Sequence, residues 1–193
     1  MPAYRAPQRI RHPWHGVDPA YDGETVTAVV EIPRGGNQKF EVDKPTGLLR
    51  LSRVLFSAFV YPFNYGFIPR TFALDNDPLD ILIVGDAARP LTLMTARIVG
   101  MLRMVDEGDE DDKILAAPVH DPRWDEVRSL KDMPAHRLTE LHHFFTHYKE
   151  LEEKQTRVSE WLDRETACAE VQASLDRYDA RYTDGTDGGA AAP

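Results

Sequence analysis

Short apolar segments recur through the first two thirds of the chain at intervals of roughly ten residues, with turn-forming residues between them. They span 25–32, 39–42, 48–55, 81–85, 92–105 and 113–119. Such spacing is typical of a β-sandwich or a small β-barrel, because each short strand must bury one face against the others. This part of the chain is therefore predicted to form a sandwich or barrel of short strands.

The pattern changes to a helical period after residue 132. Apolar side chains three or four residues apart predict a helix over 134–153, with Pro134 in its first turn: Leu138, Leu141, Phe144, Phe145, Tyr148 and Leu151. Residues 156–162 are a candidate last strand. A second amphipathic helix follows, with Asp163 as its cap and an apolar stripe of Ala167, Val171, Leu175 and Tyr178. Strands followed by helices predict an α+β fold.

The chain has 193 residues, which suits one domain. We expect an N-terminal arm over 1–23, a single domain over 24–182 and a disordered tail over 183–193, because both ends are polar and lack a period. One cysteine, Cys168, excludes a disulfide framework. The absence of an 18-residue apolar run and of an apolar leader predicts a cytoplasmic protein without a membrane contact. A net charge of −9 disfavours a general nucleic-acid binder.

Three carboxylates lie within six residues in Asp75-Asn76-Asp77-Pro78-Leu79-Asp80, directly before an apolar run. Hard divalent cations are the natural partners of such a cluster, since the acids repel one another unless a cation neutralises them. A solvated turn is the alternative, because Asp favours turns. An EF-hand loop fits less well, because Asp80 stands where that loop needs glycine.

A second acidic run occupies 106–112, where six of seven residues are Asp or Glu. It joins two apolar segments, so its ends are expected at a barrel rim, where it can face the first acidic loop. Two such loops would form a multi-cation site. A solvated hairpin is again the alternative. A scattered set of cations and phenols could bind phosphate at the same rim: Lys39, Arg53, Tyr65, Lys113, Tyr148 and Lys149.

Five blocks in this order resemble the soluble family I inorganic pyrophosphatases of bacteria. The blocks are VVEIPRGGNQKFEVDKPTGLLRLSRVL, YPFNYGFIPRT, LDNDPLDILIV, MVDEGDEDDKILAAPV and HFFTHYKELE. The resemblance runs from about Val29 to Tyr178 and implies a five-stranded OB-like β-barrel with two C-terminal flanking helices. It also implies hydrolysis of inorganic diphosphate to two orthophosphates with several Mg²⁺ ions, for which Mn²⁺ is a possible substitute.

The resemblance further implies roles for individual residues. Asp75, Asp80 and Asp111 resemble metal ligands, and Asp106 and Glu31 resemble ligands of the metals that arrive with substrate. Asp77 resembles the base that activates the attacking water. The expected phosphate contacts are Lys39, Arg53, Lys113, Tyr148 and Lys149, and Tyr65 and Glu41 fall at supporting positions. Asn76 replaces the glycine common at its position, so we expect positive φ there.

The histidines of the predicted helix suggest assembly. His142, His143 and His147 cluster within it, and bacterial members of the resembled family commonly form hexamers with this helix near the contacts, so we expect a homohexamer. Zinc binding by His143 and His147 is an alternative that lacks the HExxH glutamate. Two other functions stay open at this stage: an OB-fold module for single-stranded nucleic acid, and a calcium-binding structural protein.

Overall fold

The structure is a computed structural model that describes residues 12–182. The first half of the predicted arm and the whole predicted tail, 183–193, lie outside the described residues. The described part of the arm is folded against the domain: residues 13–16 form turns, and the Gly16 amide donates a 2.7 Å hydrogen bond to the His12 carbonyl. The turns bring the Trp14 side chain into the protein, where it is 3% exposed.

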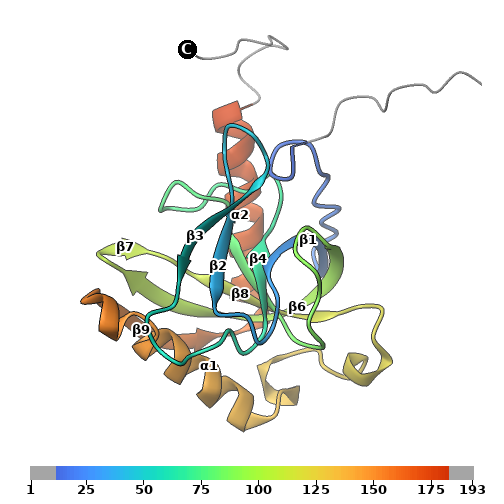
Figure 1. The fold of residues 1–193 in the computed structure, drawn as a ribbon. Helices are drawn as coiled ribbons and strands as arrows, with labels where there is room; N and C mark the ends of the chain where they lie inside the picture. The colour runs from blue at the N-terminus through green and yellow to red at the C-terminus, as the bar shows by residue number, and fades with distance from the viewer. Residues whose placement is uncertain (1–11, 183–193) are drawn as a thin grey trace, which may run out of the picture.

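Five strands close into a barrel (Figure 1). They are β1 (Thr25–Ile32), β4 (Asn64–Phe67), β5 (Asp80–Ile83), β8 (Lys113–Pro118) and β6 (Leu93–Asp106). The ring closes because β1 pairs with both β4 and β6, while β5 and β8 form its parallel pair. The predicted five-stranded OB-like barrel and the α+β class are therefore confirmed.

Further strands extend this barrel. β2 (Gln38–Val42) and β3 (Leu49–Val54) form a separate antiparallel hairpin, which rises beside the barrel in Figure 1. β7 (Asp109–Glu110) and β9 (Thr156–Leu162) both pair with the far end of the long strand β6. The prediction of a strand over 156–162 is confirmed by β9.

Two helices cover the barrel. α1 (Ala135–His147) buries Leu141, Phe144 and Phe145 in one apolar cluster with side chains of the barrel. α2 (Arg164–Tyr182) buries Ala167 and Val171 in a second cluster. Asp163 caps α2 as predicted, because its carboxylate accepts a 2.9 Å hydrogen bond from the Thr166 amide. Within residues 12–182 no helix is long and apolar enough to cross a membrane.

Two predicted elements are shorter than expected, and one strand was missed. The first helix ends at His147 rather than at 153, because the chain turns into a 3₁₀ segment (Glu150–Glu152) that stops at Glu153 in the left-handed region (φ 56°). The predicted strand over 48–55 is shorter, as β3. Strand β4 was not predicted, because all four of its residues are buried and a strand buried on both faces shows no alternation.

Candidate active site

One cavity of about 500 Å³ lies where the β2–β3 hairpin meets the rim of the barrel. Ten of the thirteen residues singled out from the sequence line it: Glu31, Lys39, Glu41, Tyr65, Asp75, Asp77, Asp80, Asp106, Asp111 and Tyr148. Both acidic loops therefore face the same space. The other three, Arg53, Lys113 and Lys149, lie behind the lining and contact its residues.

The first acidic loop is shaped by backbone turns. Asn76 has φ 69°, as predicted from its replacement of glycine. The Asp75 carboxylate accepts a 3.0 Å hydrogen bond from the Asp77 amide, and burial raises the pKa of Asp75. Asp80 begins strand β5 next to the fully buried Leu79 and Ile81. The core packing of these neighbours fixes the Asp80 carboxylate at the barrel rim.

Lys113 is a buried cation that joins the two acidic loops behind the cavity lining. The parallel register of β5 and β8 sets Asp80 beside Lys113. The Lys113 ammonium lies 2.5 Å from Asp80 Oδ2 and 2.5 Å from Asp111 Oδ1, and its side chain is 2% exposed. The Tyr65 hydroxyl donates to the same Asp80 oxygen. One ammonium group therefore bridges two of the carboxylates and reduces the repulsion between them.

The charges of this cluster respond to burial and to one another. Burial raises the pKa of Asp80 to about 6, although the Lys113 ammonium opposes the change. At Asp111 burial again acts to raise the carboxyl pKa, but Lys113, Lys39 and Lys149 together outweigh it and lower that pKa. The two carboxylates in turn outweigh burial at Lys113 and raise its pKa well above the usual value. Lys113 is therefore charged at neutral pH.

Glu31 faces the cavity from β1. It is 6% exposed, and its Oε1 accepts a 2.6 Å hydrogen bond from the Val42 amide. Burial raises the pKa of Glu31 to about 8, which this hydrogen bond only partly offsets. On the neighbouring hairpin Lys39 pairs with Glu41 at 2.7 Å. A proton or a cation is needed to neutralise Glu31, because it has no ammonium partner comparable to Lys113 among the described residues.

The second acidic run divides between two environments. Asp109 and Glu110 form the short strand β7 and are exposed, so the solvated-hairpin interpretation holds for them. Asp106 and Asp111 flank this hairpin and turn inward. Asp106 Oδ2 accepts from Lys149, whereas its Oδ1 is buried without a hydrogen-bond partner in the described structure. This free oxygen is available to a ligand in the cavity.

Arg53 approaches from β3 and lies behind the cavity lining. Its Nε is 3.1 Å from Glu152 Oε1, and its guanidinium carbon is 5.9 Å from the centre of the Tyr148 ring. The Arg53 Nε and Nη2 atoms are buried and form no aligned hydrogen bond within residues 12–182. Buried donors without acceptors are costly, so an anionic ligand would satisfy them.

The donor set fits divalent cations with oxygen ligands. Six aspartates and two glutamates line one cavity, and Asp106 Oδ1 has no partner among the described residues. In the described part of the chain, however, no three His, Cys, Asp or Glu side chains stand close enough together to hold a metal ion. Lys113 accounts for the distance between the Asp80 and Asp111 carboxylates, since its ammonium lies between them and pairs with one oxygen of each.

Several residues of the cavity were not identified from the sequence. Lys44 pairs with Asp77, and Tyr61, Trp14 and Arg50 also line the cavity. Trp14 belongs to the N-terminal arm, to which no site role was given, and Tyr61 begins the block YPFNYGFIPRT, in which only Tyr65 was given a role. The sequence contains no local pattern that distinguishes Lys44 from a surface lysine.

Comparison with known proteins identifies the family. A family model described as inorganic pyrophosphatase matches residues 28–179. A soluble inorganic pyrophosphatase of Oryza sativa subsp. indica is 44% identical over 88% of this chain and 80% of its own length. An inorganic pyrophosphatase of Geobacillus stearothermophilus is 44% identical over 82% of this chain and 97% of its own.

The fold comparison agrees with the sequence comparison. A crystal structure of inorganic pyrophosphatase from Thermus thermophilus superimposes with a TM-score of 0.83 at 37% identity, covering 88% of this chain and 99% of that one. An inorganic pyrophosphatase from Helicobacter pylori gives a TM-score of 0.82 at 36% identity, over 84% of this chain and 98% of the other. The resemblance noted in the sequence is confirmed, and the chain belongs to the inorganic pyrophosphatase family.

Proposed function

We propose that the protein hydrolyses inorganic diphosphate to two orthophosphates with Mg²⁺ as its cofactor. The observation that carries this proposal is the convergence of two acidic loops with Lys39 and Tyr148 on one cavity. Carboxylates alone would suit a cation store. The additional cations and the unpaired donors of Arg53 suit a phosphate anion that arrives together with metal ions.

In this proposal the acidic residues bind the cations, and the basic residues bind the phosphate groups. Asp75, Asp80 and Asp111 would hold the tightly bound cations, and Asp106 and Glu31 would hold those that accompany the substrate. Divalent cations, when bound, offset the negative charge of diphosphate and lower the pKa of the attacking water. Lys39, Arg53, Lys113, Lys149 and the Tyr148 hydroxyl would contact the phosphate oxygens, with Glu41 and Tyr65 orienting Lys39 and Asp80.

Asp77 is the proposed general base. It lines the cavity without being locked to a buried cation, since its side chain is 53% exposed. In the reaction the oxygen of a water molecule bonds to one phosphorus, its proton passes to the Asp77 carboxylate, and the bridging P–O bond breaks. The second phosphate leaves with the bridging oxygen. No covalent enzyme intermediate is needed, and the cavity lining contains no Ser, Cys or His nucleophile.

Phosphate release tests this proposal directly. The purified chain is incubated with diphosphate and Mg²⁺, and orthophosphate is measured by colour formation with molybdate. We expect rapid release that EDTA abolishes and Mg²⁺ restores; substitution of Mn²⁺ measures metal preference. Absence of release at millimolar diphosphate and Mg²⁺ would contradict the function. Retention of activity in EDTA would contradict the cofactor.

Two other functions give different outcomes in simple assays. A nucleic-acid module would bind an oligonucleotide with a steep dependence on salt, whereas the acidic cavity predicts little binding at any salt. A calcium-binding structural protein would bind Ca²⁺ but release no phosphate from diphosphate. The buried lysines beside the acids favour the enzyme, because a cation store gains nothing from them.

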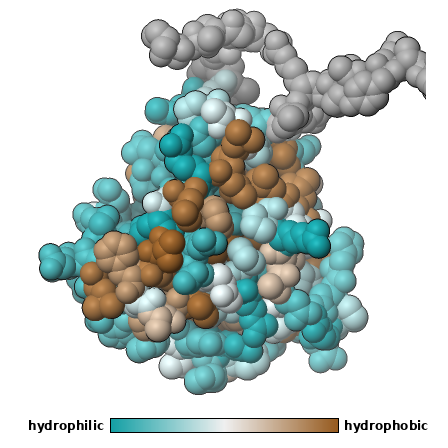
Figure 2. All heavy atoms as spheres, in the orientation of Figure 1, coloured by the Kyte–Doolittle hydropathy of each residue, from teal (hydrophilic) through white to brown (hydrophobic). Residues whose placement is uncertain are grey.

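We also propose a cytoplasmic homohexamer. Apolar side chains gather on the face that carries β2 and β3 (Figure 2), including Leu51, Val54 and Phe56, which is 67% exposed. A second surface, a groove of about 460 Å³, is lined by His142, His143, His147 and Trp161. Both surfaces suit subunit contacts. Light scattering at micromolar concentration tests the assembly, and a monomer at every pH from 5 to 8 would contradict it.

A further inference from the structure

The β2–β3 loop, residues 43–48, forms one wall of the cavity and is internally braced. The Asp43 carboxylate accepts a 2.5 Å hydrogen bond from the Thr46 hydroxyl and a 3.0 Å hydrogen bond from Arg50 Nε. The Gly47 amide donates to the Asp43 carbonyl at 2.8 Å. These hydrogen bonds hold the loop in one conformation, in which Lys44 lines the cavity.

The N-terminal segment holds this loop in place. The His12 ring lies 2.9 Å from the Lys44 carbonyl through its Nε2 atom. A Cβ atom at Gly47 would lie 2.9 Å from the His12 ring and 3.0 Å from Pro13, so the loop and the segment are in close contact. In Figure 1 the dark blue segment runs beside the tip of the β2–β3 hairpin.

The same segment is anchored to the chain that leads into the first acidic loop. The Trp14 indole donates a 2.9 Å hydrogen bond to the Thr71 carbonyl, and the Arg70 amide donates a 2.9 Å hydrogen bond to the Trp14 carbonyl. The Thr71 hydroxyl accepts from the Leu79 amide at 2.8 Å. Residues 12–14 thus fix the β2–β3 loop relative to the segment that carries Asp77.

These contacts of residues 12–14 align Lys44 with Asp77. The Lys44 ammonium forms an ion pair with Asp77 Oδ1 and lies 3.4 Å from the Asn76 carbonyl and 5.8 Å from the centre of the Trp14 ring. The side chains of Lys44 and Asp77 are each 53% exposed. An exposed ion pair changes the equilibrium between its paired and separated forms by at most about fivefold. The Lys44–Asp77 pair can therefore separate when metal ions and diphosphate enter the cavity.

We propose that Lys44, held by residues 12–14, is a positioning residue that orients the Asp77 carboxylate for proton transfer. The inference rests on the proposed function of Asp77. It assigns Lys44 no contact with substrate: its ammonium acts through the carboxylate, and its loop forms part of the cavity wall. A residue of this kind affects turnover rather than substrate affinity.

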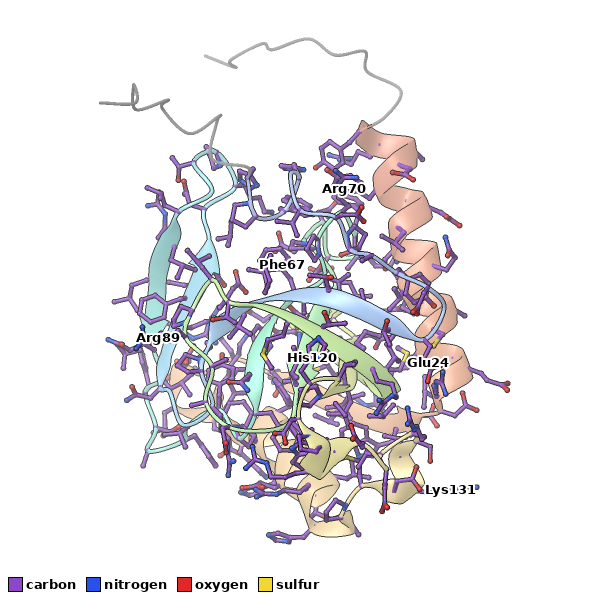
Figure 3. All side chains as sticks on the ribbon, turned by 90° about the vertical axis from the view of Figure 1, so that its right-hand side faces the viewer. Glu24, Phe67, Arg70, Arg89, His120 and Lys131 are labelled. Atoms are coloured by element: carbon purple, nitrogen blue, oxygen red, sulfur yellow. The ribbon has the colours of Figure 1, made fainter. Side chains whose placement is uncertain are left out.

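Steady-state kinetics of Lys44→Met test the proposal. We expect kcat to fall about fivefold, the size of an exposed ion pair, with KM for diphosphate within twofold of the wild type. Lys44→Arg should restore kcat to within twofold, because Arg keeps the charge. Lys131→Met is the matched control, since it removes the same charge from an exposed site at the far end of the molecule (Figure 3), and it should leave kcat unchanged.

A double-mutant cycle separates positioning from a general charge effect. If Lys44 acts through Asp77, Lys44→Met lowers kcat no further in an Asp77→Asn background. If the two residues act independently, their fold losses in kcat multiply. Multiplying losses, or a rise in KM with unchanged kcat, would overturn the proposal. Mn²⁺ binding without substrate, measured by electron paramagnetic resonance, provides a readout apart from activity. Lys44→Met should bind Mn²⁺ at least as tightly as the wild type, and weaker binding would mean that the cavity itself is disrupted, which also overturns the proposal.

The wild-type enzyme distinguishes failure of this inference from failure of the proposed function. A wild type that releases no phosphate contradicts the function itself. An active wild type together with an unaltered Lys44→Met variant contradicts only the role of Lys44.

Discussion

Replacement of the buried cation Lys113 gives the sharpest test of how the cavity is held together. Lys113→Met keeps most of the buried volume but removes the ammonium that lies 2.5 Å from both Asp80 and Asp111. Breaking a buried ion pair by removing one partner typically costs about 3–5 kcal/mol, because a buried charge is left uncompensated. Protonation of the carboxylates limits the loss, so we expect about 3 kcal/mol in the free energy of unfolding at pH 7.5. For a domain of this size that corresponds to a fall of roughly 6–12 °C in Tm.

The assay is thermal unfolding followed by circular dichroism in EDTA and in Mg²⁺. Cations should stabilise Lys113→Met more than the wild type, since they replace the missing positive charge between the two carboxylates. Lys131→Met, at an exposed position, should change the free energy of unfolding by less than about 0.5 kcal/mol. A loss below about 1 kcal/mol in Lys113→Met, or an equal gain from Mg²⁺ in variant and wild type, would refute the reasoning.

Other substitutions probe separate parts of the structure. Asp77→Asn should lower kcat about 10²–10⁴-fold with little loss of Mn²⁺ affinity, and equal loss of affinity in Asp77→Asn and Asp80→Asn would contradict the division of roles. Gly66→Ala should cost at least about 3 kcal/mol of stability by chemical denaturation, because its Cβ would lie 1.9 Å from the Val29 carbonyl oxygen; a smaller loss would mean that β1 and β4 separate easily. Burial and the nearby His12 lower the pKa of His15 to about 4. The unfolded state therefore binds the proton first, and stability should fall between about pH 6.5 and pH 4 by about 1–2 kcal/mol, allowing for partial exposure; His15→Gln should remove that part of the pH dependence, and an unchanged profile would rule out His15 as its source.

The strands of the barrel and the two acidic loops could be predicted because their evidence is local. Apolar runs bounded by turns located β1, β5, β6 and β8, and helical spacing located both helices. The left-handed backbone of Asn76 followed from its replacement of glycine in the resembled family. Local evidence ended where a segment is buried on both sides, as in β4, because there the residues carry no alternation.

Contacts between distant segments could not be predicted in the same way. Lys44 meets Asp77 across 33 positions, since His12 and Trp14 hold a hairpin loop and a segment before β5 together. The first helix stops early because the chain must turn to carry Lys149 to Asp106 and Glu152 to Arg53. Apolar side chains keep their helical spacing past this turn, at Tyr148 and Leu151, so the sequence predicts a helix that extends to 153.

The second acidic run shows how one segment can satisfy two opposing interpretations. From the sequence, a solvated hairpin and a ligand-binding loop are alternative interpretations of the whole run 106–112. The structure assigns them to different residues, because β6 pairs with β7 for two positions and exposes Asp109 and Glu110. Asp106 and Asp111 stand where this pairing begins and ends, so their side chains return to the rim. Function in such a run follows from strand register rather than from composition, and register is set by the barrel.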